Sequence, residues 1–326
     1  MPSDSVVATQ PEGRIHSPQI SRQPRFGEDG MPWNWVLRIG RLVILAGPLL
    51  WFGAGVNRRP PQTTAHHALF QGVQYHRTYR PAPRPTMLHV VKVNLAAPGL
   101  QVLVTPGQAR ALEWETNART TSAFLREFKL QLAVNANFFH PFAENTPWDY
   151  YPRVGDRVGV VGQAISNAVE YGPPLQNWPV LCFLTQAAQI LATETCPKGT
   201  QHAVAGNTVI VAQGQPAPNL ATLPQAHAYS RTAIALDRSG KTLWIVIVDA
   251  KQWGYSEGIT LAELAEVAIA QGADTALNLD GGGSATLVTA TSGGPKVLNA
   301  PAHAKIPMQE RPVANHIGFY ARPLTP

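Results

Sequence analysis

The sequence predicts an α+β fold, in which a strand-rich mixed sheet carries a few packed helices and is preceded by one membrane segment. Three observations lead to this prediction. From residue 86 onward, apolar runs of strand length alternate with Gly- and Pro-rich turns. Residues 259–273 have the apolar periodicity and the end signals of a helix. An uncharged run of 15 residues, Leu42–Val56, lies near the N-terminus and apart from every other core pattern.

Four segments follow from these patterns. We expect a disordered arm over residues 1–34, a signal anchor or transmembrane helix over 35–56, a Pro-rich linker over 57–85 and the folded domain over 86–326. Arg38 and Arg41 precede the apolar run, which also has the form of the hydrophobic region of a signal peptide. The domain is therefore expected on the non-cytoplasmic side, either anchored to the membrane or secreted.

The charge of the chain separates the N-terminal part from the domain. The 326 residues carry a net charge of +6, and residues 1–85 hold ten arginines and four acids, which also gives +6. Residues 86–326 hold the remaining 16 basic and 16 acidic residues and are therefore neutral. A neutral domain argues against a surface that follows nucleic-acid phosphates, so no nucleic-acid partner is expected.

The first half of the domain is expected to consist mostly of strands. Residues 88–95 and 100–106 flank the turn sequence AAPG and predict a hairpin. A helix is expected over 120–130, where a threonine stands at the start. The strand expected over 131–139 ends in amides and aromatic residues. Further short strands are expected at 180–185, 188–193 and 207–215.

The second half of the domain contains the clearest local signals. Residues 231–237 and 242–250 flank RSGK and predict another hairpin. In the helix expected over 259–273, Thr260 and Glu263 form a capping box, and Gly272 stands where a C-terminal cap belongs. A strand over 275–279 follows the helix, and residues 314–321 form the last expected strand.

The strand expected over 275–279 ends at a carboxylate and three glycines, in the run LNLDGGGSATLV. Gly281, Gly282 and Gly283 each cost backbone entropy on folding, so a simple turn does not account for all three. They permit positive φ and close approach of the backbone to a ligand, and their N–H groups can face an anion. We therefore expect Asp280 and Ser284 to belong to a functional site with these glycines.

Cys182 and Cys196 lie 14 positions apart. Neither belongs to a CxxC pair, so a zinc site is not indicated. In an exported domain the two cysteines are expected to form a disulfide, whereas in a cytosolic protein they would be two buried thiols.

The glycine run, together with AVNANFF, RTAIALD and RPVANHIGF, resembles the phosphodiester glycosidase family over roughly residues 86–323. The resemblance implies hydrolysis of a sugar-1-phosphate diester, which releases the sugar and leaves a phosphomonoester. It implies a phosphodiester-linked glycan as the partner, in the cell envelope or on exported glycans. No cofactor is expected, and no spacing of His, Cys and Asp indicates a metal site.

The residues themselves agree with this chemistry. A sugar-1-phosphate diester has a leaving group that is already a weak base, so it needs less protonation than an ordinary glycoside. Asp280 is the candidate to attack C1 or to activate water, and Asp249 is either a second carboxylate or a turn acid. The candidates for contacts with the substrate are Arg231 and Arg311 for the phosphate, and Asn135, Asn137 and Asn315 for sugar hydroxyls or an amide.

The charge state of Asp280 depends on two opposed influences. Burial raises the pKa of a carboxyl group, while amide donors and arginines lower it. We expect the lowering influences to prevail, which leaves Asp280 ionised at neutral pH.

Two other functions fit the same residues. One is a non-catalytic glycan-binding or exopolysaccharide-assembly module that has the same pocket. The other is an ordinary glycosidase, which needs a second carboxylate roughly 5–10 Å from Asp280. Asp249 or Glu257 would have to supply that group.

Overall fold

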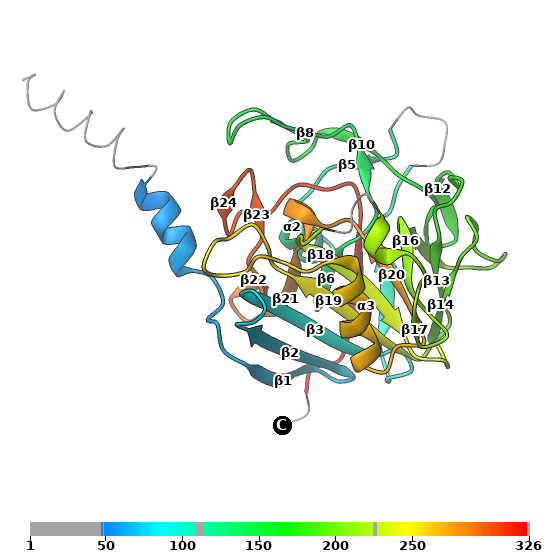
Figure 1. Ribbon diagram of the computed structural model, residues 1–326. Coiled ribbons are helices and arrows are strands. Elements are labelled where there is room, and N and C mark those ends of the chain that lie inside the picture. The colour runs from blue at the N-terminus through cyan, green and yellow to red at the C-terminus, as the bar shows by residue number, and fades with distance from the viewer. Residues whose placement is uncertain (1–46, 48, 109–113, 224–226, 325–326) are drawn as a thin grey trace, which may run out of the picture. The chain divides into compact units, whose positions relative to one another are not determined.

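A large sheet and a smaller sheet pack face to face in the computed structural model (Figure 1). The structure describes residues 47, 49–108, 114–223 and 227–324, and the compact unit that carries the sheets spans Leu50–Pro326. The large sheet has eight strands in the order β1 (Ala65–Phe70), β2 (Val73–Arg80), β3 (Thr86–Asn94), β19 (Thr242–Val248), β18 (Arg231–Leu236), β20 (Thr275–Leu279), β16 (Thr208–Ala212) and β17 (Gln215–Pro216).

The facing sheet has five strands, in the order β22 (Gly294–Val297), β21 (Leu287–Thr291), β6 (Leu132–Asn135), β25 (His316–Tyr320) and β4 (Gln101–Val104). A second five-stranded sheet contains β12 (Val169–Gly172), β11 (Ala164–Ser166), β15 (His202–Ala205), β13 (Val180–Leu184) and β14 (Ala187–Leu191). Smaller sheets are formed by β5 (Thr116–Asn117), β10 (Arg157–Val160) and β7 (Phe139–His140), by β8 (Ala143–Glu144) and β9 (Tyr150–Tyr151), and by β23 (Ala302–His303) and β24 (Ile306–Pro307).

Every pairing between these named strands is antiparallel. The strand-rich α+β prediction is therefore confirmed, but the prediction of a mixed sheet is wrong. Antiparallel neighbours can be joined by short turns, whereas parallel neighbours need long crossover connections. The hairpin of β18 and β19 is such a short connection, and it confirms the prediction for residues 231–250.

The central strands of the large sheet are buried on both faces. Along β19, Leu243, Ile245 and Ile247 face the main core with the smaller sheet. Trp244 and Val246 point the other way, into a second core that includes helix α3 (Leu261–Ala270). A strand covered on both faces reads as a continuous apolar run, which is how residues 242–248 appear in the sequence.

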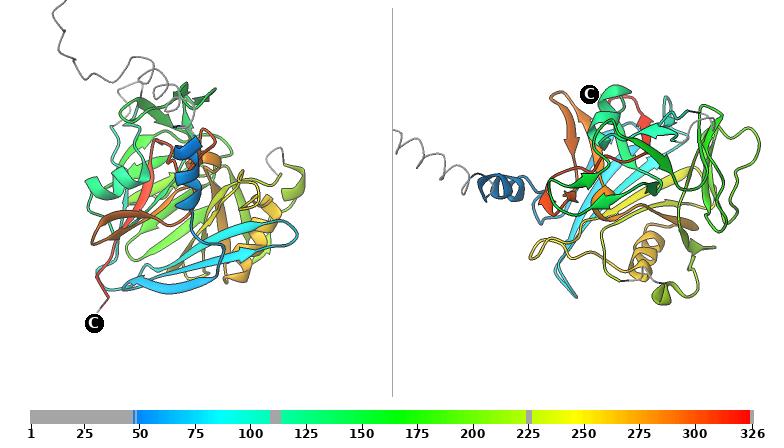
Figure 2. Two further views of the ribbon diagram at one scale, coloured as in Figure 1. Left: turned by 90° about the vertical axis from the view of Figure 1, so that its left-hand side faces the viewer. Right: turned by 90° about the horizontal axis from the view of Figure 1, so that it is seen from above.

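Helix α2 (Thr121–Glu127) covers the outer face of the five-stranded sheet, where Phe124 and Leu125 pack against Ala133 and Val288. The layers are thus α3, the eight-stranded sheet, the five-stranded sheet and α2. The right-hand view of Figure 2 shows the molecule from above, with α2 and α3 on opposite sides of the strands.

Both helices have the caps that the sequence predicts. Thr260 accepts a hydrogen bond from the backbone of Glu263, whose side chain accepts one from the Thr260 backbone in return. Gly272 follows the helix with φ +98°, a conformation that glycine adopts without strain. Thr120 caps α2 by accepting a hydrogen bond from the backbone N–H of Ala123, although this helix ends at Glu127 rather than near residue 130. Two short 3₁₀ helices, η1 (Leu220–Thr222) and η2 (Gly282–Ser284), complete the elements.

Two sequence predictions about connections are wrong. Residues 88–95 and 100–106 do not form a hairpin, because β3 pairs with β2 and β19 in the large sheet while β4 pairs with β25 in the other. Residues 65–80 are not a linker, because they form β1 and β2. Prolines on either side of this segment led to its interpretation as a linker. Buried and exposed residues nevertheless alternate at the start of β2, where Val73 and Tyr75 are buried.

The N-terminal predictions fall mostly outside the described residues. These include the arm over 1–34 and most of the apolar segment over 35–56. Residues 49–57 are helical. Among the helices that the structure describes, none combines the length and the apolar character that crossing a bilayer requires.

Cys182 and Cys196 form a disulfide with their Cα atoms 5.7 Å apart, which confirms the predicted pairing. The bond ties strand β13 to the loop that follows β14. A loop of this length is expected to contribute about 3 kcal/mol to the free energy of unfolding in the chain-entropy treatment.

Candidate functional site

The glycine run crosses from one sheet to the other. Strand β20 belongs to the eight-stranded sheet and β21 to the five-stranded sheet, and Asp280 opens the loop between them. A cavity of about 360 Å³ lies beside this loop. Its described lining consists of Phe138, Phe139, Phe142, Asn207, His227, Tyr229, Arg231, Asn278, Leu279, Asp280, Gly281, Gly282 and Arg311.

The backbone of Asp280 is held by the end of strand β6. The Asp280 N–H donates to the carbonyl of Ala136 at 3.1 Å, and Asn135 Nδ2 donates to the Asp280 carbonyl at 2.6 Å. Asn135 Oδ1 accepts from the backbone N–H of Thr286 and from the hydroxyl of Thr232, each at 3.1 Å. The Asn135 amide is completely buried. It therefore fixes both ends of the glycine loop and is not positioned to contact a ligand in the cavity.

All three glycines are required by their surroundings. A Cβ on Gly281 would lie 2.4 Å from the backbone carbonyl oxygen of Ser230. Gly282 has φ +60°, and a Cβ there would lie 2.9 Å from the Tyr229 ring. A Cβ on Gly283 would lie 2.6 Å from Nη2 of Arg311, so only glycine lets the guanidinium group rest on the loop. Gly281 and Gly282 line the cavity, while the N–H of Gly282 donates to the Ser230 carbonyl at 3.0 Å. The loop thus brings Asp280 and Arg311 together.

Arg311 lines the cavity, where polar contacts hold its guanidinium group. Its Nη1 donates to the Ser284 hydroxyl at 3.2 Å, its Nε donates to His303 Nδ1 at 3.2 Å, and its Nη2 pairs with the carboxylate of Glu144. The guanidinium carbon lies 4.4 Å from the centre of the Phe142 ring. Glu144 belongs to β8, so the β8–β9 hairpin meets the cavity at Arg311.

Arg231 is the second cation of the cavity. Its Nε donates to the Ile259 carbonyl at 3.3 Å and its Nη2 to the His227 carbonyl at 2.7 Å. Burial lowers the pKa of Arg231 to about 10, so the guanidinium remains charged at neutral pH. The structure therefore brings both predicted arginines to the same cavity as Asp280.

Asp280 is partly exposed to this cavity and is otherwise surrounded by protein. Burial raises its pKa to about 6, against the lowering effects of Arg311, the Ser284 hydroxyl and the Gly281 amide. The expectation that the lowering influences prevail is therefore wrong. A carboxyl group with a pKa near 6 is still mostly ionised at pH 7, although with a smaller margin than the sequence suggested.

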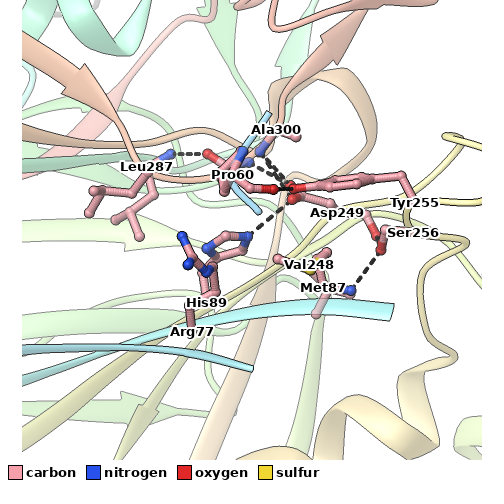
Figure 3. Close-up of polar contacts among 12 residues, drawn as sticks. Pro60, Arg77, Met87, His89, Val248, Asp249, Tyr255, Ser256, Leu287 and Ala300 are labelled. Carbon is pink, nitrogen blue, oxygen red and sulfur yellow. Dashed lines mark hydrogen bonds and ion pairs between the residues drawn. The ribbon is translucent and has the colours of Figure 1, made fainter. Parts of the chain in front are cut away.

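Asp249 lies in a different, sealed network (Figure 3). Its carboxylate accepts from Asn299 Nδ2 at 2.9 Å and from the Ala300 N–H at 3.0 Å, and it contacts His89 Nε2 at 3.0 Å. Its side chain has no exposed surface. Asn299 in turn accepts from the backbone N–H of Leu287 at 2.8 Å. Asp249 therefore supports the far end of the glycine loop and does not reach the cavity.

Asn137 and Asn315 are also placed away from the cavity. Asn315 Oδ1 accepts from the Asn137 N–H at 2.9 Å, and its Nδ2 donates to Asn137 Oδ1 at 3.0 Å. Asn137 Nδ2 donates to the carbonyl of Val161 at 3.0 Å. The two side chains join strands and have almost no exposed surface. Glu257, the other acid considered as a second carboxylate, lies exposed in the loop before α3.

Several lining residues were not predicted from the sequence. They are the aromatic residues Phe138, Phe139, Phe142 and Tyr229, and the polar residues Asn207, His227 and Asn278. A signal existed for Asn278, because it lies two positions before Asp280 at the end of the same strand. The phenylalanines follow directly on the NAN sequence that was singled out, in the run NFFHPF.

The raised pKa of Asp280 predicts how its charge affects stability. Because the folded state favours the protonated carboxyl group, ionisation costs stability once the pH exceeds the unfolded pKa of about 4. Asp280→Asn removes that cost. We expect the variant to be more stable than wild type at pH 7 by about 1–3 kcal/mol, at about 1.4 kcal/mol per pKa unit, and the difference to vanish near pH 4. Urea unfolding at both pH values measures this, and a variant less stable at both would contradict it.

Comparisons with known proteins agree with the fold. A hypothetical protein from Synechocystis is 16% identical with a TM-score of 0.58, and the match covers 81% of this chain and 64% of that one. The chain thus spans somewhat less than two thirds of that protein. A "putative exported protein" from Burkholderia pseudomallei is 12% identical with a TM-score of 0.55, covering 80% of this chain and 97% of that one.

A third solved structure is the catalytic domain of zebrafish N-acetylglucosamine-1-phosphodiester alpha-N-acetylglucosaminidase, auto-inhibited by its pro-peptide. It is 18% identical with a TM-score of 0.53, and the match covers 82% of this chain and 93% of that one. At these identities the structures show a shared fold. No match was found among curated proteins. A sequence model described as phosphodiester glycosidase matches residues 128–320, more than half of the chain. The chain therefore belongs to the phosphodiester glycosidase family.

Proposed function

We propose that this protein hydrolyses a sugar-1-phosphate diester, releasing the sugar and leaving a phosphomonoester. The observation that carries the proposal is the meeting of one carboxylate, Asp280, with two guanidinium groups, Arg231 and Arg311, in one cavity. Guanidinium groups bind phosphate oxygens, and the charge of a phosphodiester matches such a site. Membership of the phosphodiester glycosidase family and the structural similarity to the zebrafish catalytic domain support this proposal.

The reaction breaks the bond between C1 of the sugar and the phosphate oxygen. Water supplies the hydroxyl group that ends on C1, and its proton leaves with the phosphomonoester or enters solvent. Asp280 either attacks C1 first, forming a glycosyl ester that water then cleaves, or removes the proton from the attacking water. Both roles need the ionised carboxylate, which predominates above pH 6.

Asp249 is not retained as a catalytic group in this proposal. Its buried contacts with His89, Asn299 and Ala300 support a role in holding the loop. A phosphate leaving group departs without full protonation, so a second carboxylate acting as an acid is not needed. Likewise, Asn135, Asn137 and Asn315 are proposed to support the cavity rather than to contact the sugar.

We also propose that the domain works outside the cytoplasm, held to the membrane by the apolar N-terminal segment or released after cleavage there. The disulfide between Cys182 and Cys196 supports this location, because such bonds persist in oxidising compartments. The Burkholderia relative, described as a putative exported protein, adds support.

A reporter fused after residue 326 tests this location. An enzyme reporter that folds only after export should be active in that position, because the domain is expected to cross the membrane. A reporter that is active only in the cytoplasm should remain silent. Activity of the cytoplasmic reporter alone would overturn the proposal.

The proposed activity is tested by turnover of methyl diesters of sugar 1-phosphates, compared with nitrophenyl glycosides. We expect the full chain to release free sugar from the diesters, and Asp280→Asn to lose at least about a hundredfold in kcat. Because the active form is the ionised carboxylate, kcat/KM should fall as the pH drops through about 6. The residual activity of Asp280→Asn should lack this pH dependence.

The same measurements identify the competing functions. Folded protein that binds sugar phosphates without turnover at any pH would indicate the glycan-binding module. Preferred turnover of the nitrophenyl glycosides would indicate an ordinary glycosidase. Circular dichroism on the same samples separates a lost reaction from a lost fold.

The arginines are expected to act mainly on substrate binding. Phosphate contacts exist in the ground state and the transition state, so Arg311→Ala should raise KM while kcat changes less. The loss of a charge-assisted contact is expected to raise KM by roughly tenfold to a hundredfold. Glu144→Gln is the matched control, since it alters the β8–β9 hairpin contact but keeps the guanidinium group. An equal rise of KM in both variants would show that the hairpin, rather than the cation, is responsible.

A further inference from the structure

The cavity contains a buried amide whose oxygen has no hydrogen-bond partner in the described protein. Asn278 lies on β20, two residues before Asp280, and is 2% exposed. Its Nδ2 donates to Asn207 Oδ1 at 2.8 Å and to the Leu279 carbonyl at 3.1 Å. Its Oδ1 is buried without a partner, although the residue lines the cavity. Buried polar atoms are normally paired, so this acceptor needs an explanation.

The orientation of the Asn278 amide is determined by its neighbours. The oxygen and nitrogen of an asparagine side chain are assigned from the groups that they contact. The Leu279 carbonyl can only accept a hydrogen bond, so it requires the nitrogen of Asn278 on its side. The reversed amide would place one carbonyl oxygen against another. The unpaired atom is therefore the oxygen.

Asn278 is also held rigidly in place. Its main-chain carbonyl accepts from the Asn207 N–H at 3.2 Å, so the two asparagines are joined through both backbone and side chains. Asn207 leads directly into β16, and Asn278 pairs with Ala233 in β18. An acceptor held between three strands is preorganised, and it discriminates more sharply between ligands than a mobile side chain does.

We propose that Asn278 is a specificity-determining residue whose Oδ1 accepts a hydrogen bond from a hydroxyl or amide N–H of the sugar. This inference rests on the proposed function. It further specifies that the sugar end of the substrate lies against β20. The oxygens of a phosphodiester carry no proton at neutral pH, so they cannot donate to Oδ1. We assign the donor to the sugar, because C1 reacts at Asp280 on the same strand end, and we place the phosphate toward Arg311.

Asn278 lies close enough to Asp280 to orient the substrate for the reaction. The two residues are two positions apart at the end of β20, so a sugar donor bound to Asn278 Oδ1 holds the sugar next to the carboxylate that acts at C1. A ligand without that donor leaves a buried acceptor unpaired, and sites of this kind reject such ligands. We expect the loss of the donor to weaken binding by roughly tenfold to a hundredfold.

Fluorine substitution on the sugar tests the inference. The probes are the 1-phosphates of glucose, mannose and N-acetylglucosamine, together with their deoxyfluoro analogues. Fluorine replaces a hydroxyl group at similar size but cannot donate a hydrogen bond. Calorimetry on the full chain should show one ring position at which fluorine weakens binding about tenfold or more. This comparison needs no protein variant, so it does not depend on whether a variant folds.

Two variants then assign the effect to Asn278. In Asn278→Ala the fluorine penalty should disappear, because the acceptor is gone. In Phe138→Leu, which changes an apolar lining residue, the penalty should remain. A penalty that persists in Asn278→Ala would overturn the assignment.

The failures of the two proposals differ. If wild type binds the sugar phosphates and Arg311→Ala weakens that binding, but no fluorine position matters, the Asn278 proposal is wrong and the phosphodiester site stands. If wild type binds none of the sugar phosphates, the proposed function fails, and this inference fails with it.

Discussion

The candidate site depends on the buried amide of Asn135. Three glycines give the loop after Asp280 great freedom and no side chains with which to hold itself. The Asn135 amide supplies the missing restraint, because it binds the Asp280 carbonyl at one end of the loop and the Thr286 N–H at the other. It also binds Thr232 of the neighbouring strand. The loop can therefore be open enough for a ligand and still hold Asp280 in one position.

The electrostatics of the site follow from this restraint. Asp280 is fixed where protein surrounds much of its side chain, which raises its pKa, while Arg311 opposes that rise. Arg311 is itself shared with Glu144. Although burial raises the pKa of Glu144, Arg311 and His303 lower it further, so the net shift is downward. The cavity thus places two cations near two carboxylates, and Asp280 is the one that the cavity exposes.

Local signals in the sequence were sufficient for part of this fold. The capping box of α3 and the β18–β19 hairpin involve residues close in sequence, so their chemistry is visible without the fold. The glycine run identified Asp280 for the same reason. The strands β1 and β2 were missed because prolines surround them, although β1 pairs with β2, and β2 with β3, through short local turns.

The direction of a polar side chain at the end of a strand was not predictable. Asp249 and Asp280 both follow apolar strands, yet one lies in a sealed network and the other faces the cavity. The same holds for the asparagines, because burial depends on the strand that lies opposite. Asn137 faces Asn315 from another part of the chain, whereas Asn278 faces the cavity. The opposing element is chosen by topology, which a single sequence does not reveal.

The contact between Arg311 and Glu144 has a consequence for ligand affinity. The guanidinium group already binds an anion of the protein, the carboxylate of Glu144 on the β8–β9 hairpin, and it lies against Phe142, which directly precedes β8. A phosphate that takes the N–H now bound to Glu144 displaces that carboxylate, so binding through this N–H exchanges one anion for another. Measured affinities then report the difference between two charge-assisted contacts. Simple anions will consequently bind to Arg311 more weakly than its charge alone implies. Because Glu144 belongs to β8, its displacement also couples the occupancy of the cavity to the position of the β8–β9 hairpin.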